Sequence, residues 1–319
     1  MNVARLDLSY QSTLLLFLVF VFGICLCLCL VFFFVFLFRL LKCAGGMNKL
    51  QTDFQASEQK VVIVTGGNAG IGLATVCQFL EEGAYVISVD RSHEDYSKTY
   101  MQQFYTSGNY HQVQYDFAVI HGIKTLARQI FELCGKRPID VLVINHAMFT
   151  FGKVGIPGTG SETQTDRNVS VARWHETFDV NVVSYAKLIE AVFPFMEDGG
   201  AIVTLCSTGS FDANAENICY NASKAAVAHL TRCAAKDLAQ CGVRVNGVAP
   251  GSILTQASLN HMRLLNMSEK EGKKRFAAES PLNRQGKPEE IADVISFLAS
   301  KKAGFIVGQI ITVDGGALL

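Results

Sequence analysis

The sequence predicts an α/β fold, in which one doubly wound parallel sheet of about seven strands forms a single domain preceded by one transmembrane helix. Three observations support this prediction: short apolar runs alternate with amphipathic stretches from Lys60 onward, a glycine-rich turn follows the first run, and a long uncharged run precedes them all. The expected organisation is a short polar head at 1–13, a transmembrane helix at 14–38, a linker at 39–59 and the α/β domain at 60–319.

The run from Leu14 to Phe38 is long enough to span a membrane. Its 25 residues include no charged residue, no proline and one glycine. A helix of this length rises roughly 37 Å, whereas a hydrocarbon core is roughly 30 Å thick. The alternatives are a buried core helix, which would show a polar face, and a signal peptide, whose apolar region is only about 7–15 residues long. We therefore expect a membrane anchor.

Seven apolar runs in the rest of the chain are expected to be strands. Several are β-branched and nearly continuous in apolar residues, as strands buried on both faces should be. Amphipathic stretches between them, including 70–82, 174–197 and 220–240, predict helices. Because strands alternate with helices, the sheet should be parallel and covered on both faces. The expected strands cover 60–65, 84–90, 111–117, 139–145, 201–207, 243–249 and 305–314.

A glycine-rich turn with the sequence TGGNAGIG joins the first strand to the first helix. Glycines let the backbone approach a pyrophosphate closely, and the helix that follows offers free N–H groups and a positive dipole end. This position between a strand and a helix predicts a dinucleotide site rather than an ordinary turn. No Gly-Lys-Ser/Thr follows, so the turn is not a P-loop. The contact residues expected here are Thr65, Gly66, Asn68, Gly70, Ile71 and Gly72.

The end of the second strand bears on the choice of cofactor. Asp90 lies 18 residues beyond Gly72, and a carboxylate there can bind both hydroxyls of an adenosine ribose and repel a 2′-phosphate. An ordinary aspartate at a strand end is the alternative, and Arg91, which follows directly, could instead hold a 2′-phosphate. Because the glycine-rich turn contains no Lys or Arg, we expect NAD rather than NADP.

Tyr220 and Lys224 are candidates for acid/base chemistry because residues four apart share one helix face. An ammonium group near a phenol favours the phenolate and lowers a pKa that starts near about 10. A tyrosine in that setting can exchange protons near neutral pH. The pair alone is commonly a solvated helix face, but Ser207 ends a strand 13 residues before Tyr220 and could hydrogen-bond a substrate carbonyl. Asn145 also closes a strand, and Asn181 lies within a helical pattern.

Residues 60–319 resemble the short-chain dehydrogenase/reductase family, which has a Rossmann fold. The TGGNAGIG turn resembles its cofactor loop, and GQIITVDGG resembles its last strand. Asn145-His146-Ala147 is similar to its Asn-Asn-Ala-Gly element, although His146 and Met148 replace the usual Asn and Gly. The resemblance implies a catalytic tetrad and further cofactor contacts. The implied tetrad is Asn181, Ser207, Tyr220 and Lys224, and the implied cofactor contacts are Asp116, Asn145, Ala147, Tyr220, Lys224, Pro250, Gly251 and Thr255.

The resemblance also implies direct hydride transfer between a nicotinamide and a carbonyl or secondary alcohol carbon. Tyr220 would donate or take the hydroxyl proton, and Ser207 would orient and polarise the oxygen. Lys224 would bind the nicotinamide ribose and keep Tyr220 acidic, while Asn181 would hold a water of a proton relay. A membrane-bound NAD-binding scaffold or sensor without activity is the alternative, and the intact tetrad argues against it. Reductases of carbon–carbon or carbon–nitrogen bonds on this fold often alter the Ser and the Tyr/Lys spacing, and neither change is present.

Two variable segments are expected to determine the substrate. Residues 148–173 either form a rim of the active site or are a surface insertion. The second segment is 252–280, in which LNHMRLLNM at 259–267 either lines a lipophilic pocket or packs a lid helix. The anchor is compatible with a lipid-soluble substrate such as a steroid, a retinoid or a 3-oxoacyl compound. Family members pair through two long helices, here about 174–197 and 217–240, so we expect a homodimer or a homotetramer.

Charge and cysteine content narrow the possible partners. The 28 Lys and Arg residues balance 28 Asp and Glu residues, which gives no electrostatic case for nucleic acid. The ten cysteines show no metal-ligand spacing, so no metal site is expected, and their scatter is typical of a reducing compartment. Arg39, Lys42 and Lys49 follow the apolar run, whereas only Arg5 precedes it. The catalytic domain should therefore face the cytosol, with the endoplasmic reticulum as a plausible membrane.

Overall fold

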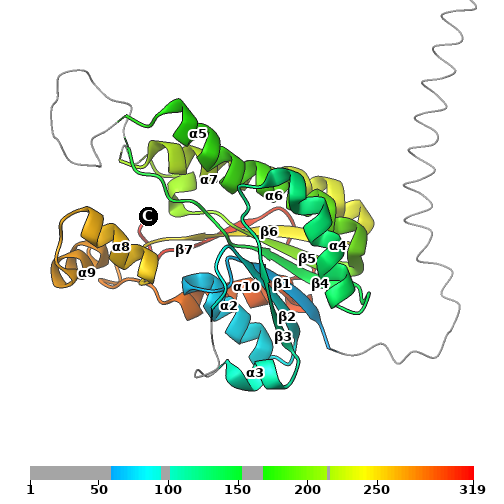
Figure 1. Ribbon diagram of the computed structural model, residues 1–319. Helices are drawn as coiled ribbons and strands as arrows, with labels where there is room; N and C mark the ends of the chain where they lie inside the picture. The colour runs from blue at the N-terminus through cyan, green and yellow to red at the C-terminus, as the bar shows by residue number, and fades with distance from the viewer. Residues whose placement is uncertain (1–58, 95–100, 153–167, 214–215) are drawn as a thin grey trace, which may run out of the picture. The chain divides into compact units, whose positions relative to one another are not determined.

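The computed structural model describes residues 59–94, 101–152, 168–213 and 216–319, which form one α/β domain (Figure 1). The predicted polar head, the transmembrane helix at 14–38 and the linker up to residue 58 lie outside the described residues. Within the described ranges, no helix is both long and apolar enough to cross a membrane.

One parallel sheet of seven strands lies at the centre of the domain, in the order β3-β2-β1-β4-β5-β6-β7. The strand order reverses between β1 and β4, and ligands of such sheets bind outside the carboxyl ends of the strands at this point. The predicted seven-stranded Rossmann fold is therefore confirmed. The strands are β1 (Val61–Thr65), β2 (Tyr85–Asp90), β3 (Tyr110–Gln114), β4 (Ile139–Ile144), β5 (Met196–Leu205), β6 (Arg244–Pro250) and β7 (Ile310–Val313).

Helices cover both faces of the sheet, as Figure 1 shows. Successive residues of β1 point to opposite faces: Val61 and Ile63 pack in one core, and Val62 and Val64 pack in the other. This explains why the strands are apolar without interruption. The first core is formed with α4 (Ile123–Leu133), α6 (Ser184–Val192) and α7 (Ile218–Leu238), and the second with α2 (Gly70–Glu81) and α10 (Pro288–Ala299).

The helix predicted over 174–197 is interrupted twice. α5 (Val171–Phe178) passes through a π-helical turn at Asp179–Val183 before α6 begins. After α6 comes a single 3₁₀ turn at Phe193–Phe195, and β5 begins at Met196. Pro194 lies in that turn and has no N–H group to continue the helix. The prediction of one long helix was therefore wrong in its interior and at its end.

Differences of more than one residue occur at three strands, and five of the described helices, α4 and α10 among them, had not been predicted individually. β5 covers Met196–Leu205 rather than 201–207. β3 ends at Gln114 rather than at 117, and β7 begins only at Ile310, because Gly308 has a φ of +70° that breaks the extended run. The additional short helices are α3 (Gln102–Thr106), α8 (Gln256–Leu264) and α9 (Glu269–Ala277). The two last helices occupy the predicted variable segment at 252–280.

Candidate functional site

The carboxyl ends of neighbouring strands bring most of the predicted site residues to one edge of the sheet. Thr65, Asp90 and Pro250 end β1, β2 and β6, respectively. Asn145 directly follows β4, and Ser207 comes two residues after β5. Residues far apart in the sequence therefore meet at the point where the strand order reverses, which is where this fold binds ligands.

The glycine-rich turn is shaped for a close approach of backbone to ligand. Gly66 and Gly70 have φ angles of +64° and +53°, which side chains other than glycine rarely adopt. A Cβ on Gly72 would lie 2.5 Å from Asn145 Nδ2 and closer still to the carbonyl oxygen of Gly66. α2 begins at Gly70 with no side-chain cap and no acidic residue in its first turn. The turn and the helix N-terminus therefore fit the pyrophosphate of a dinucleotide.

Asp90 lies against this turn. Its carboxylate accepts a hydrogen bond from the backbone N–H of Asn68 at 3.2 Å and another from the N–H of Ser92 at 3.2 Å. The side chain of Asn68 is held in turn, because its Oδ1 accepts from the Ser88 hydroxyl at 2.9 Å and its Nδ2 donates to the Ser92 carbonyl at 2.7 Å. Asp90 is thus placed where a ribose-binding carboxylate is expected, and Arg91 beside it is exposed.

Asn145 fixes the turn from the β4 side. Its backbone N–H donates to Thr65 Oγ1 at 3.1 Å, and its Nδ2 donates to the Gly66 carbonyl at 2.9 Å. The neighbouring Ala147 is exposed, and Ile71 is partly exposed. Asp116 lies two residues beyond β3, where its carboxylate accepts from the N–H of Ala118 at 2.9 Å.

His146, which departs from the family pattern, takes part in packing. Its Nδ1 lies 2.7 Å from Thr65 Oγ1, and its Nε2 lies 2.7 Å from Ser184 Oγ. The ring stacks on Phe117 with a centroid separation of 3.7 Å and an interplanar angle of 7°. Burial, reinforced by the charge of Lys224, holds the pKa of His146 well below its usual range. The neutral imidazole therefore ties β1 to α6 beneath the cofactor turn.

We expect His146→Ala to lower the free energy of unfolding by about 2–4 kcal/mol, because two buried hydroxyls each lose one of their hydrogen-bond partners and the stacked ring leaves a cavity. Urea denaturation, followed by the fluorescence of the single tryptophan, Trp174, measures the change. His121→Ala serves as the control because His121 is exposed. Equal stability of the two variants would contradict the packing role.

Tyr220, Lys224 and Ser207 meet beyond the end of β5. Both α7 residues lie on one face, and the Lys224 Nζ is 5.9 Å from the centre of the Tyr220 ring. Lys224 is buried and donates to the Leu205 carbonyl at 2.6 Å. The Ser207 hydroxyl interacts with Tyr220 and accepts the N–H of Gly209 at 3.1 Å. The structure therefore groups three of the four predicted catalytic residues directly.

Asn181, the fourth, lies in the π-helical turn and is fully buried. Its Nδ2 donates to the Met148 carbonyl and to Ser223 Oγ, each at 2.9 Å, while its Oδ1 accepts the N–H of Met148 at 2.7 Å. The Ser223 hydroxyl donates to the backbone carbonyl of Tyr220 at 2.7 Å. Asn181 thus connects the segment after β4 to the catalytic helix. Both of its side-chain amide hydrogens are used in doing so. A relay water could therefore bind Asn181 only by donating to its side-chain oxygen or to its backbone carbonyl oxygen.

The pKa of Tyr220 moves in the opposite direction from the one predicted. Burial raises the pKa of Tyr220 to about 12, although its hydrogen bond with Ser207 opposes the shift. Burial also lowers the pKa of Lys224 to about 8. The predicted lowering of the Tyr220 pKa is absent for two reasons. The ammonium group of Lys224 donates to the Leu205 carbonyl, and desolvation of the Tyr220 phenol is the largest effect on its pKa. Tyr220 is therefore protonated at neutral pH, as a proton donor must be.

Tyr185 is a neighbour of Lys224 that the sequence pattern does not single out. It is fully buried, and its hydroxyl donates to the His146 carbonyl at 2.7 Å. The Lys224 Nζ donates to the same hydroxyl at 3.5 Å. The Tyr185 hydroxyl is therefore a second polar group that helps to hold Lys224. In the sequence, only the position of Tyr185 one turn beyond Asn181 indicated that it could lie near the site.

The loop after β6 is anchored from two sides. Gly251 donates its N–H to the Val313 carbonyl at 3.0 Å. Thr255 caps the N-terminus of α8, and its methyl group would lie 3.2 Å from a Cβ added to Gly70. The loop that the resemblance assigns to the nicotinamide thus lies directly against the glycine-rich turn.

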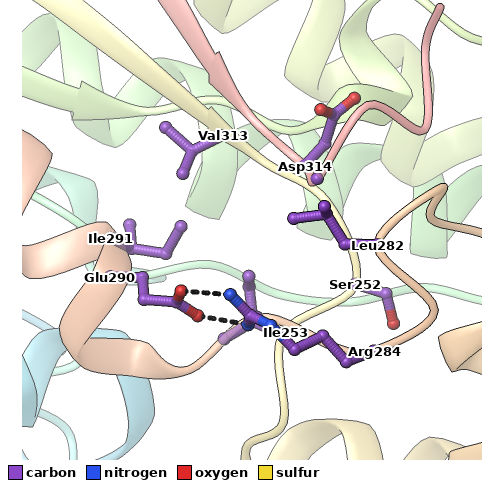
Figure 2. A pocket seen from close by; sticks show the side chains of 10 residues that line it. Ser252, Ile253, Leu282, Arg284, Glu290, Ile291, Val313 and Asp314 are labelled. Atoms are coloured by element: carbon purple, nitrogen blue, oxygen red, sulfur yellow. Dashed lines mark hydrogen bonds and ion pairs between the residues drawn. The ribbon is translucent and has the colours of Figure 1, made fainter.

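A pocket of about 160 Å³ lies behind this loop (Figure 2). Arg284 lies along one side of it and forms two ion-pair contacts with the carboxylate of Glu290, at 2.7 and 2.6 Å. Leu254 and Gly286 pair through a backbone hydrogen bond of 2.9 Å. The pocket is smaller than the roughly 300–1,000 Å³ of ordinary ligand sites. We therefore infer that the residues lining this pocket hold the loop in place and do not bind substrate.

The predicted substrate segments are described in part. Residues 153–167 of the 148–173 segment lie outside the described residues. In the 252–280 segment, Met262 is buried against Gly272 of α9, whereas Leu264 is exposed. Packing between helices therefore accounts for part of the Met/Leu content there.

Comparisons with known proteins agree with this geometry. Residues 66–317 match a protein family described as Enoyl-(Acyl carrier protein) reductase. The chain is 32% identical to the 7alpha-hydroxysteroid dehydrogenase of Bacteroides fragilis, covering 81% of this chain and 94% of that protein. It is also 32% identical to the 3-oxoacyl-(acyl-carrier-protein) reductase FabG of Thermotoga maritima, covering 82% and 99%.

Solved structures of similar proteins have the same fold. The aldohexose dehydrogenase of Thermoplasma acidophilum matches with a TM-score of 0.69 and 30% identity, over 82% of this chain and 94% of that chain. RhlG of Pseudomonas aeruginosa, solved as an NADP active-site complex, matches with a TM-score of 0.69 and 26% identity, over 82% and 96%.

Proposed function

Because the chain belongs to the short-chain dehydrogenase/reductase family, we propose that its NAD(P)-dependent hydride transfer acts on lipophilic ketones and secondary alcohols, with NAD as the preferred cofactor. The chain is an oxidoreductase acting on CH–OH groups. The assignment of the active site rests on one observation. Ser207, protonated Tyr220 and Lys224 lie together at the sheet edge beside the glycine-rich turn. A non-catalytic scaffold is not favoured, because it has no use for this arrangement.

The bound dinucleotide supplies or accepts the hydride, and the residues of the chain handle the proton and the substrate oxygen. Gly209 donates to Ser207 Oγ and so occupies an acceptor position of the serine, and the hydroxyl hydrogen of Ser207, which can bond Tyr220, can turn to a substrate oxygen bound beside it. Tyr220 holds a proton on its hydroxyl, ready for the oxygen of a carbonyl that is being reduced. Lys224, with a pKa of about 8, is mostly charged at neutral pH and can favour the tyrosinate that remains.

A substrate panel tests this proposal. The full chain in detergent is given ketones and secondary alcohols of graded hydrophobicity, with NAD(H) or NADP(H), and turnover is followed through the nicotinamide absorbance. We expect the highest kcat/KM for apolar substrates. Best turnover of polar sugars or of charged acids would contradict the lipophilic class. Absence of any nicotinamide-dependent turnover would contradict the oxidoreductase itself.

We expect the unmodified chain to use NAD with a kcat/KM at least about tenfold above that for NADP, because the Asp90 carboxylate repels a 2′-phosphate. Asp90 also holds the Asn68 N–H, so Asp90→Ala would disturb the turn as well as the charge. Asp90→Asn removes the charge and keeps one of the two acceptor oxygens, which can still hold the Asn68 N–H at the expense of the bond to Ser92, and it should narrow the preference for NAD over NADP. Steady-state kinetics with both cofactors measures the effect. A preference of the unmodified chain for NADP would assign the 2′-phosphate to Arg91 instead.

We also propose a homodimer or homotetramer that pairs through α5–α6 and α7. The family resemblance supports this assembly, and so do two apolar side chains exposed on the first of these elements, Val171 at 72% and Val183 at 37%. Light scattering of the purified chain measures the mass. A monomer at micromolar concentration would contradict the proposal.

Finally, we propose that residues 14–38 anchor the chain in a membrane and that the catalytic domain faces the cytosol. The uncharged length of this run and the positive charges of Arg39, Lys42 and Lys49 after it support the proposal. In sealed microsomes, protease should digest the domain without detergent. Protection from protease, or a glycan on Asn168 or Asn266, would overturn the orientation.

A further inference from the structure

A cluster of four aromatic rings lies beside the catalytic tyrosine. The ring centre of Phe149 is 4.5 Å from that of Tyr220 and 4.6 Å from that of Phe151. His261 lies 4.6 Å from Phe151 and 5.5 Å from Phe149, and Phe276 lies 5.2 Å from His261. These separations are typical of interacting aromatic pairs. We call Phe149, Phe151, His261 and Phe276 the aromatic wall.

Three separate segments contribute to the aromatic wall, which makes it a tertiary feature rather than a local one. Phe149 and Phe151 follow β4, His261 lies on α8, and Phe276 lies on α9. Phe276 is 7% exposed and supports the wall from behind, whereas Phe149 is 41% exposed although it packs on Tyr220. A side chain that packs on the ring of the catalytic tyrosine thus presents an exposed aromatic surface.

The aromatic wall carries no formal charge at neutral pH. Burial and the charge of Arg275 lower the pKa of His261, and Glu216 only partly opposes the shift. His261 is therefore a neutral ring with a polar edge. An anionic or strongly hydrated group of a substrate would lose its water against these rings without gaining a partner of opposite charge in the wall.

We propose that the aromatic wall binds an aromatic ring of the substrate, attached within a few bonds of the carbon that exchanges the hydride. The proposal rests on the proposed function, because the position of the ring is inferred from a substrate oxygen that Tyr220 would handle. A substrate whose oxygen binds at the Tyr220 hydroxyl would have its substituents near the Tyr220 ring, on which Phe149 packs at a centroid distance of 4.5 Å. There an added aromatic ring gains both buried area and the directional face-to-edge attraction that an alkyl chain or saturated ring lacks.

The test uses two ketones that differ only in their ring: benzylacetone and its ring-hydrogenated analogue. Both carry the same methyl ketone at the same distance from a six-membered ring, so their intrinsic reactivity is matched. We expect the full chain to reduce benzylacetone with a kcat/KM about three- to tenfold higher, the range given by one aromatic pair. Phe149→Leu keeps apolar bulk and should bring the ratio close to one. Phe131→Leu is the control, because Phe131 stacks on Phe195 in another part of the fold and should leave the ratio unchanged.

The outcomes separate this inference from the proposed function. A ratio near one in the unmodified chain, or a ratio that Phe149→Leu leaves unchanged, overturns the aromatic wall as a binding site. If the chain reduces other carbonyl compounds but neither of these two ketones, the aromatic wall is likewise overturned as a binding site, while the proposed function stands. If no carbonyl compound is reduced, the proposed function fails. The ratio of dissociation constants of the two ketones for the NADH-loaded chain, measured by calorimetry, then decides the inference by itself.

Discussion

Tyr220→Phe is expected to lower kcat by about three orders of magnitude and to leave the dissociation constant of NADH within about twofold. The substitution removes the hydroxyl that carries the proton, while the ring can still pack on Phe149 at a centroid distance of 4.5 Å. Steady-state turnover of a ketone and a fluorescence titration with NADH measure the two quantities separately.

Tyr85→Phe provides the matched control for this substitution. The Tyr85 hydroxyl donates to the Leu133 carbonyl at 2.8 Å and lies at the amino end of β2, on the opposite edge of the sheet. Its loss should reduce stability slightly and leave kcat unchanged. Near-normal turnover of Tyr220→Phe would show that another group handles the proton.

Gly72→Ala is expected to weaken NADH binding by about a hundredfold or more. The added methyl group would lie 2.5 Å from Asn145 Nδ2 and closer still to the Gly66 carbonyl, so the backbone of the glycine-rich turn must move away from its ligand-binding position. Fluorescence titration with NADH gives the dissociation constant, and circular dichroism checks that the variant is folded.

A second glycine separates this effect from general backbone strain. Gly83 has a φ of +83°, and a Cβ added there meets nothing within 4 Å. Gly83→Ala should therefore cost stability through its backbone conformation alone and leave the affinity for NADH unchanged. A folded Gly72→Ala variant that binds NADH as tightly as the unmodified chain would exclude the proposed role of the turn.

The fold could be predicted because its signals are local. Several strands, β1 and β4 among them, are runs rich in β-branched residues, and the turn from Thr65 to Gly72 is indicated by its own glycines. Asp90 and Ser207 could be identified as site residues because the carboxyl edge of a parallel sheet collects whatever follows each strand. The ends of helices were less predictable: the apolar pattern continues through Phe193–Phe195, and Pro194 was the one signal that the helix ends there.

The site features that escaped prediction depend on which distant residues meet. The pKa of Tyr220 depends on its burial and on the direction in which Lys224 points, and neither can be deduced from a spacing of four residues. The aromatic wall joins Phe149 to His261, which lie on separate elements with no shared pattern. His146 could be recognised as a departure, but its bonds to Thr65 and Ser184 appear only in the folded chain.

The π-helical turn at Asp179–Val183 also has a consequence for insertions and deletions. Relative to a continuous α-helix, such a turn holds one additional residue, and each residue of an α-helix advances the side chains by about 100°. Removing one residue of the turn would restore a regular helix and leave α6 in register, whereas removing a second residue would rotate the whole of α6 by that angle. Tyr185 and Leu188, now fully buried, would then turn away from the core. The length of this segment, and not only the identity of Asn181, is therefore under constraint in any functional variant of the chain.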